Sequence, residues 1–153
     1  MKRNPFDKFI KGETAIHFAV AEYLQYQYPG VMFHHSPNES RRTPFERYLI
    51  SKMGVSAGYP DFIIYYKDYS FALELKHNNN IPTEAQIKWL KKFRSMRNGF
   101  SCVAWTVDIA IKFVDSFLKE VNNTAIDMTL IDSAYFVELN DNLPKSIIKK
   151  INL

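Results

Sequence analysis

Two apolar runs that lie close together, FIIYY at residues 62–66 and FALEL at residues 71–75, constrain the fold of this chain most strongly. Runs rich in aromatic and β-branched residues, with a short polar break between them, predict a β-hairpin. Charged residues nevertheless stand at the ends of the runs: Asp61 precedes the first, and Glu74 and Lys76 flank the end of the second. A fold for this chain therefore has to explain charges in strands that otherwise look buried.

We expect the hairpin to turn at residues 68–69, which places Asp61 directly opposite Lys76. In this register one face is wholly apolar and consists of Phe62, Ile64, Tyr66, Phe71, Leu73 and Leu75. The other face carries Asp61 and Lys76, with Glu74 diagonal to Asp61 at a Cβ distance of about 7–8 Å. A slip of one residue would move Asp61 to the opposite face, so the clean apolar face predicts that the three charged groups lie together.

Two carboxylates and an ammonium group on one sheet face have a chemical use. Hard oxygen ligands suit Mg²⁺ or Mn²⁺, and such an ion polarises a phosphoryl oxygen and acidifies a bound water. A lysine beside it orients that water or offsets developing negative charge. The structural alternative is that Asp61 is only a turn residue after Pro60, and that Glu74 and Lys76 line a solvated strand edge. The complete set with its shared parity favours the site.

Outside the hairpin, hydrophobic periodicity predicts four helices and two further strands. The helices are expected at residues 13–27, 45–53, 83–98 and 108–121, and the strands at residues 31–35 and 100–107. A strand, a helix and a second strand in succession imply a parallel pair joined by a right-handed crossover, whereas the hairpin supplies an antiparallel pair. The expected fold class is therefore α/β, with a small mixed sheet of about four strands flanked by helices.

Several residues mark the inner faces and ends of these elements. The first helix has an inward stripe of Ile16, Val20 and Leu24, with Glu13 and His17 on the same side. The last helix has a stripe of Ile111, Val114, Leu118 and Val121. Gly99 is expected to end the third helix, as a C-terminal glycine usually does. Further on, residues 135–139 read as a strand and residues 144–151 as a basic helix with Pro at its first position.

Composition limits the function less than these patterns do. The chain has 153 residues, which favours one domain, and its formal net charge of +4 permits an anionic partner such as nucleic acid. No apolar run approaches the roughly 20 residues that cross a bilayer, so no membrane segment is expected. The single cysteine, Cys102, lies in an apolar run and is expected to be a buried hydrophobe. One cysteine excludes a disulfide within the chain and fits a reducing, intracellular setting.

The segments GYPDF, ALELK and TEAQ resemble the PD-(D/E)XK nuclease superfamily, and most closely its VRR-NUC branch. Pro60 and Asp61, followed by Glu74 and Lys76, match the superfamily signature. The features that match the branch are Gly54, Gly58, Gln86, the HSPNE segment at residues 35–39 and Glu13 in the first helix. The resemblance covers about residues 13–107 and implies a restriction-endonuclease-like core.

The resemblance also implies a metal-dependent DNA nuclease and assigns roles to its residues. Asp61, Glu74 and the main-chain carbonyl of Leu75 would bind Mg²⁺ or Mn²⁺. Glu13 would complete the metal site directly or through water, and Glu22 is the second choice for that role. Lys76 would assist the attacking water.

The supporting residues have structural interpretations as well. Gln86 forms a capping box with Thr83 in the sequence, while the resemblance implies a contact with the site, and both roles are compatible. The histidines at positions 17, 34, 35 and 77 fit no zinc spacing and are expected to be structural or peripheral, with His17 at most at the rim. The basic residues that we expect to contact DNA phosphates are Arg41, Arg42, Lys52 and Lys88, with Lys91 and Lys92 as further candidates.

Short standalone VRR-NUC proteins, typical of phages and bacteria, tend to be homodimers that act on branched DNA such as four-way (Holliday) junctions. We therefore expect a cytoplasmic homodimeric endonuclease of a bacterium or phage, with a nuclease domain at residues 1–121. Residues 122–153 would form an extension that packs on the domain or on a dimer partner. The aromatic-rich stretch at residues 23–28 is a candidate dimer surface. The alternatives are a non-catalytic DNA-binding module on the same fold and a nuclease directed to flaps or duplexes.

Overall fold

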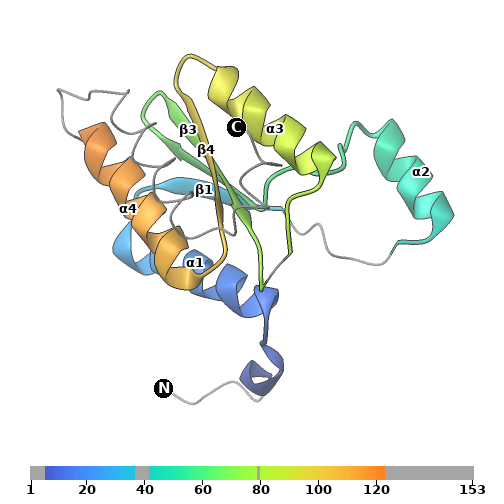
Figure 1. The fold of residues 1–153 in the computed structure, drawn as a ribbon, viewed down its shortest axis with the longest axis horizontal. Coiled ribbons are helices and arrows are strands. Elements are labelled where there is room, and N and C mark those ends of the chain that lie inside the picture. Colours follow the sequence, from blue (N-terminus) through green and yellow to red (C-terminus); the bar gives the residue numbers. More distant parts are fainter. Residues whose placement is uncertain (1–5, 37–41, 79, 123–153) are drawn as a thin grey trace.

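The computed structural model describes residues 6–36, 42–78 and 80–122, which form one four-stranded sheet with helices packed on it (Figure 1). The elements follow the order expected from the sequence, after a short 3₁₀ helix, η1, at Asp7–Phe9. They are α1 (Glu13–Gln27), β1 (Met32–His35), α2 (Pro44–Lys52), β2 (Phe62–Tyr66), β3 (Tyr69–Leu75), α3 (Glu84–Ser95), β4 (Gly99–Ala104) and α4 (Val107–Asn122). The strand and helix expected at residues 135–139 and 144–151, and the extension after residue 122, lie outside the described residues.

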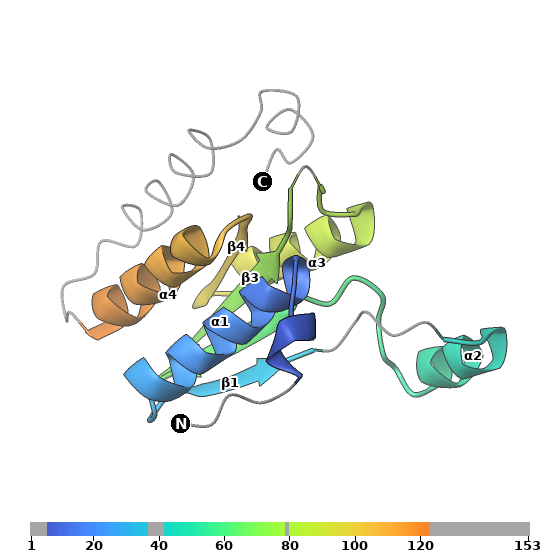
Figure 2. The same ribbon diagram turned by 90° about the horizontal axis from the view of Figure 1, so that it is seen from below.

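The sheet has the order β1-β2-β3-β4. β2 pairs antiparallel with both β1 and β3, whereas β3 and β4 are parallel and are joined through α3. The expected mixed sheet and its crossover helix are therefore confirmed. Helices α1 and α4 cover one face of the sheet, and α3 covers the other (Figures 1 and 2). None of the helices in the described part of the chain has the length and apolarity that crossing a bilayer requires.

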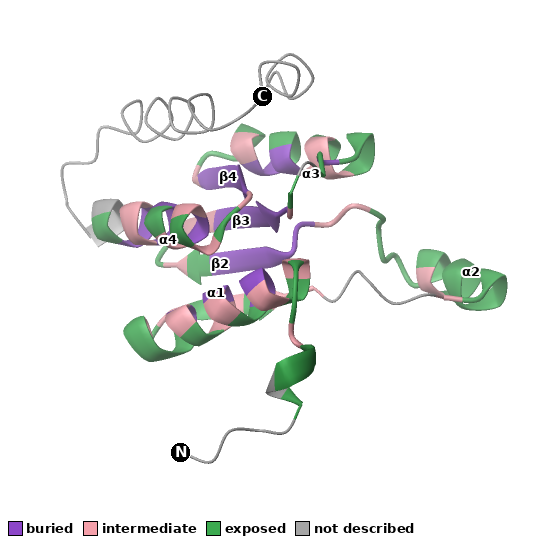
Figure 3. Ribbon diagram, turned by 60° about the horizontal axis from the view of Figure 1, so that its bottom comes forward, coloured by how far each residue is buried: buried purple, intermediate pink, exposed green. Residues whose placement is uncertain are grey.

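The apolar face of the hairpin packs under α1 and α4, and most residues of β2, β3 and β4 are buried (Figure 3). The stripe expected on α1 is confirmed, because Ile16, Val20 and Leu24 are all buried. On α4 the expected stripe is shifted. Ile111 is only half-buried and Val121 is outside the described side chains, while the buried side chains are Ala110, Phe113, Val114, Phe117 and Leu118.

Phenylalanines decide which way α4 faces. Phe117 stacks on Phe71 of β3 with ring centroids 4.9 Å apart, and Phe113 is also almost fully buried. Burying a large apolar side chain contributes about 1.5–3 kcal/mol, so two phenylalanines outweigh Ile111 at the edge of the stripe. The cysteine behaves as expected, since Cys102 lies fully buried in β4.

The register of the hairpin differs from the expected one by two residues. Tyr66 pairs with Tyr69 and Phe62 pairs with Leu73, so the two-residue turn lies at Lys67 and Asp68. Lys67 adopts a positive φ of 51°, which tight hairpin turns require. Continued by one residue, this register places Asp61 opposite Glu74, and the predicted pairing of Asp61 with Lys76 is wrong.

The reason for the difference is that Tyr69 belongs to the strand. Its ring packs against Phe100 with centroids 6.2 Å apart, so leaving it in the turn would forfeit apolar burial. Because the shift is two residues rather than one, every side chain stays on its predicted face.

The end of α3 also differs from the expectation. The helix stops at Ser95, and Gly99 is the first residue of β4 rather than a helix-ending glycine. Its backbone φ is not positive, but a Cβ at this position would collide with the carbonyl oxygen of Phe93. Gly99 is therefore required by the close approach of β4 to the end of α3.

Gly58 lets the loop before β2 touch the start of α3. Its φ is 75°, and an added Cβ would lie 2.6 Å from both the Ala85 carbonyl carbon and the Gln86 nitrogen. We expect Gly58→Ala to lower the free energy of unfolding by about 2–4 kcal/mol, because backbone strain and overpacking add.

The matched control is Gly54→Ala, since Gly54 has a φ of 81° but open space around its Cβ position. Gly54→Ala should lower the free energy of unfolding only by the cost of backbone strain, about 1–2 kcal/mol. Denaturant unfolding of both variants measures the two losses. Equal losses would contradict the close contact between the Gly58 loop and α3.

Helix α2 stands away from the sheet, and the loop that contains Gly58 connects it to β2 (Figures 1 and 2). It is a well-formed helix, because Thr43 and Glu46 make a complete capping box at its start. None of its residues is buried. Its exposed large apolar side chains are Phe45, Tyr48 and Leu49, and Met53 follows directly after it.

Candidate active site

Three charged side chains are buried together at one end of the hairpin. Asp61 is 5% exposed, Glu74 is 0% exposed and Lys76 is 8% exposed. The Lys76 Nζ atom donates to Glu74 Oε1 at 2.7 Å. Burial and, next, the nearby charge of Asp61 raise the pKa of Glu74 to about 8, although Lys76 acts in the opposite direction. The three groups predicted from the hairpin thus interact with one another, despite the altered register.

Asp61 is held by the backbone of the neighbouring strands. Its Oδ2 atom accepts a hydrogen bond from the Leu75 amide at 2.8 Å, and its main-chain oxygen accepts one from the Ser36 amide, also at 2.8 Å. The next amide, that of Lys76 directly after β3, donates instead to the main-chain oxygen of Ala104 in β4 at 2.9 Å. In a strand the amide and carbonyl of one residue point toward the same neighbouring strand, so the Leu75 carbonyl faces the side on which Asp61 lies.

The second oxygen of Glu74 has an unusual environment. Glu74 Oε2 is buried and has no hydrogen-bond partner among the described residues. A buried carboxylate oxygen left without a partner costs roughly 1–3 kcal/mol or more. This orphaned acceptor, close to a second carboxylate, is the point at which a cation would lower the energy of the site most.

Gln86 takes both of the roles considered for it. Its Oε1 atom accepts from the Thr83 amide at 2.8 Å, which completes the capping box of α3. Its Nε2 atom donates to Glu74 Oε1 in a short hydrogen bond. The capping box turns the Oε1 atom of Gln86 toward the Thr83 backbone amide. The Nε2 atom of the same side chain therefore points toward Glu74.

This double role makes Gln86→Glu informative. Glutamate at this position keeps the capping box, as Glu46 does in α2, but it removes the donor and adds a carboxylate beside Glu74. We expect a loss of about 1–3 kcal/mol in the free energy of unfolding in EDTA.

Glu46→Gln is the matched control, because it makes the converse exchange at the equivalent position of an exposed helix. It should change stability much less than Gln86→Glu does, because the group is exposed at the surface. Thermal unfolding compares the two variants. A Gln86→Glu protein as stable as the wild type would contradict the bond to Glu74.

Helix α1 brings a third carboxylate and a histidine to the site. Glu13, in its first turn, adds to the raised pKa of Glu74. The His17 Nε2 atom lies 3.9 Å from Glu13 Oε1 and 3.8 Å from Asp61 Oδ2. Its other ring nitrogen, Nδ1, lies 2.7 Å from Nε2 of His35.

His17 lies closer to the carboxylates than we expected from the sequence. It is buried between α1 and the sheet, whereas we expected it at the rim at most. The available signal was its spacing: His17 follows Glu13 by four residues, so the two side chains share one face of the helix.

The remaining candidates are more scattered. Arg42 is half-buried and lines a cleft described below, whereas Lys52 lies over the Tyr48 ring on α2 and Lys88 is exposed on α3. Glu22 is exposed on α1. Arg41 lies outside the described residues. These side chains are not gathered at the carboxylates, and their roles stay predictions.

The donor set fits a hard divalent cation such as Mg²⁺. No three histidine, cysteine, aspartate or glutamate side chains in the described ranges are arranged as a ready metal site. Mg²⁺, however, usually keeps several waters and binds through one or two carboxylates. Asp61 and Glu74 supply two carboxylates and Leu75 a carbonyl, while the orphaned Oε2 atom and the raised pKa of Glu74 indicate missing positive charge.

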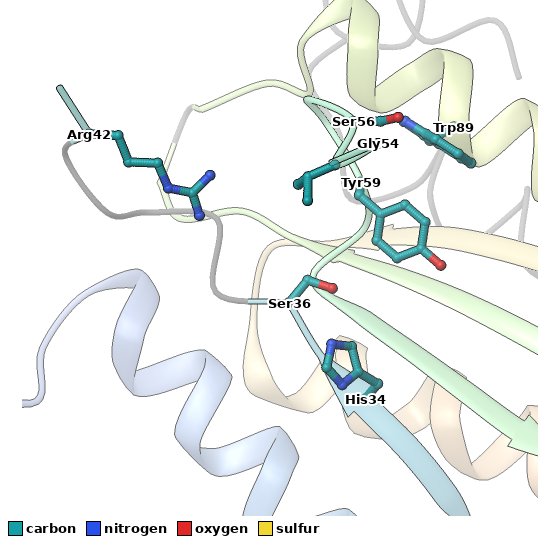
Figure 4. Close-up of a pocket in the computed structure, with 8 residues that line it drawn as sticks. His34, Ser36, Arg42, Gly54, Ser56, Tyr59 and Trp89 are labelled. Carbon is teal, nitrogen blue, oxygen red and sulfur yellow. The ribbon is translucent and has the colours of Figure 1, made fainter. Parts of the chain in front are cut away.

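A cleft of about 470 Å³ opens between the end of β1 and α3 (Figure 4). Its lining residues are His34, Ser36, Arg42, Gly54, Val55, Ser56, Tyr59 and Trp89. The cleft is formed by the end of β1, the loop before β2 and one side of α3, and sequence reasoning did not identify it. A space of this size is typical of small-molecule sites.

Comparison with known proteins supports the architecture. No family model matches the chain, and no curated protein matches it either. A solved structure described as a VRR_NUC domain protein aligns with a TM-score of 0.57 and 24% sequence identity, covering 71% of this chain and 89% of that one. The described part of this chain therefore has the fold of a VRR_NUC domain protein, which confirms the restriction-endonuclease-like α/β core expected from the sequence.

Proposed function

We propose that this chain is a metal-dependent DNA endonuclease, with Asp61, Glu74 and Lys76 as its catalytic residues. The observation that carries the proposal is the buried Glu74 carboxylate, which has one oxygen paired to Lys76 and one orphaned. Its pKa is raised to about 8 by burial and by Asp61. Perturbed carboxylates of this kind concentrate at functional sites. The fold shared with a VRR_NUC domain protein supports the same proposal.

The residues that would hold Mg²⁺ or Mn²⁺ are Asp61, Glu74 and the carbonyl of Leu75, with Glu13 acting directly or through a water. When bound, such an ion supplies Lewis-acid polarisation of a phosphoryl oxygen and lowers the pKa of a water. Asp61 is positioned for this by the Leu75 amide, and Glu74 is positioned by Gln86. Both carboxylates are thus held by hydrogen bonds before any ligand arrives, which is the preorganisation that electrostatic catalysis requires.

Lys76 has two tasks in the proposed reaction. Its ammonium group orients the attacking water and stabilises the negative charge that develops on the phosphate. The water oxygen attacks phosphorus, the bond from phosphorus to the 3′ oxygen breaks, and the water proton ends on that oxygen. We expect 5′-phosphate and 3′-hydroxyl ends.

For the substrate we propose branched DNA, such as a four-way junction, cut by a homodimer. The net charge of +4 is compatible with DNA as a partner. Exposed aromatic side chains, including Tyr26 at 76% exposed and Phe45 at 67%, offer apolar surface for a second copy. Two copies would supply the two cutting centres that symmetric cleavage of a junction needs.

The test is cleavage of a four-way junction, a flap and a linear duplex by the purified full chain, with Mg²⁺, with Mn²⁺ and with EDTA. We expect the junction to be cut fastest with either ion and no cutting in EDTA, and light scattering should give a dimer. Cutting of the flap or the linear duplex as fast as the four-way junction would contradict the proposed preference for junctions. Binding to DNA without cutting under any of these conditions would favour the non-catalytic module.

A further inference from the structure

The cleft of about 470 Å³ is connected to the carboxylates by three separate parts of the chain. Ser36, at the end of β1, donates its amide to the main-chain oxygen of Asp61. Tyr59 stands two residues before Asp61 in the sequence. Trp89 follows Gln86 by three residues on α3, so it lies one helical turn from the side chain that contacts Glu74.

Strand pairing places the cleft and the carboxylates on the same face of the sheet. His34 of β1 pairs with Ile63 of β2, and Ile63 pairs with Ala72 of β3. Paired residues share a face, and every second residue along a strand returns to it. His34 therefore stands on the face of the sheet that carries Asp61 and Glu74.

The walls of the cleft carry side chains of the types that commonly bind nucleotides. The Tyr59 and Trp89 rings meet edge to face with centroids 5.0 Å apart, and Lys92 lies 4.7 Å over the Trp89 ring. Arg42 extends from the opposite wall, and its guanidinium faces the space between (Figure 4). Aromatic rings stack on any exposed base, and guanidinium groups bind phosphate.

We propose that this cleft holds an unpaired nucleotide of the DNA strand being cut, with its base against Tyr59 and Trp89 and a phosphate at Arg42. The inference rests on the proposed function, because the strand in the cleft is taken to be the DNA strand that is cut. It adds the substrate class, which is DNA with an unpaired nucleotide. A base inside a duplex has both faces covered and cannot enter such a cleft without leaving the stack. The preferred DNA therefore has at least one unpaired nucleotide next to the cleavage site.

The test measures binding in EDTA, so that it does not depend on metal or on cutting. Two labelled DNA duplexes are compared, one fully paired and one with a single unpaired 2-aminopurine nucleotide. We expect the wild type to bind the second duplex at least about tenfold more tightly, with a change in 2-aminopurine fluorescence. Tyr59→Leu should remove most of this preference, whereas Tyr59→Phe, which keeps the ring, should retain it.

Arg42→Ala provides a variant that leaves the aromatic wall intact and keeps the inference testable if Tyr59→Leu does not fold. Its control is Arg97→Ala, which removes the same charge from an exposed position beyond α3. Arg42→Ala should weaken binding of the unpaired-base duplex severalfold more than Arg97→Ala. Circular dichroism checks that each variant is folded.

Three results would overturn the inference: no preference for the unpaired base, a preference unchanged in Tyr59→Leu, or equal effects of the two arginine variants. Tight binding of deoxyadenosine monophosphate with no preference among duplexes would also overturn it, because the cleft would then be a site for free nucleotides. The proposed function fails separately, by absence of cutting with Mg²⁺ or Mn²⁺. A preference lost in Tyr59→Leu would support the cleft even for a protein that does not cut.

Discussion

Asp61→Asn is expected to cut DNA at least about 10³-fold more slowly than the wild type while it binds the same DNA with similar affinity. The substitution removes one of the two carboxylates that would hold the cation, but it keeps an oxygen that can accept the Leu75 amide. The fold should therefore survive. Cleavage rates at saturating Mg²⁺ and DNA affinity in EDTA measure the two effects.

Two further variants separate chemistry from structure. Asp61→Ala leaves the buried Leu75 amide without its acceptor, so it should also lose about 1–3 kcal/mol of stability. Asp68→Asn removes a carboxylate from the exposed hairpin turn and should cut normally. Cleavage at the wild-type rate by folded Asp61→Asn would contradict the catalytic role of this residue.

Glu74→Gln is expected to make the metal-free protein more stable at high pH. Burial and the nearby Asp61 raise the pKa of Glu74 from 4.5 to about 8 in the folded protein, so the folded state binds this proton more tightly than the unfolded state does. The resulting stabilisation is complete below about pH 4.5 and is lost progressively as the pH rises toward about 8. Glutamine does not ionise and avoids this loss.

The measurement is the difference in free energy of unfolding between Glu74→Gln and the wild type, in EDTA, from pH 4.5 to pH 9. Groups that do not interact with Glu74 cancel in this difference, among them Asp115, where burial acts to raise the pKa but hydrogen bonds from Tyr28 and Tyr23 lower it overall. We expect the difference to be small at the acidic end and to grow to at most about 5 kcal/mol in favour of Glu74→Gln above pH 8. A constant difference would show that Glu74 ionises without penalty in the fold.

The faces of the hairpin were predictable because side chains alternate strictly along a strand. Any register that buries Phe62, Phe71 and Leu75 together also collects Asp61 and Glu74 on the other face. The order of elements followed from hydrophobic periodicity and from a few breakers, such as the proline and glycine after α1. Fold class and the central charged group were thus accessible without coordinates.

The register itself was not predictable from the same pattern. Shifting one strand by two residues keeps every side chain on its face, so the apolar pattern is equally good for both pairings. The choice depends on whether Tyr69 packs against Phe100, which is a contact with a strand thirty residues further along the chain. Packing of this kind is decided by tertiary structure and leaves no local signal.

The same limit applies to the surroundings of the carboxylates. The contacts of His17 require α1 to lie over the start of β2, and the cleft requires β1, a loop and α3 to meet. Gln86 shows the opposite case, because its capping role is local in sequence and was correctly predicted. Its bond to Glu74 joins that local motif to the site.

Calorimetric titration of the full chain with Mn²⁺ tests most directly whether the buried carboxylates form a cation site. We expect the wild type to bind the ion and to release a proton near pH 7, since binding requires Glu74, with its pKa of about 8, to ionise. Asp61→Asn should bind at least about tenfold more weakly, while Asp68→Asn should match the wild type. Absence of Mn²⁺ binding by the wild type, or equal affinity in Asp61→Asn, would contradict a metal site formed by Asp61 and Glu74.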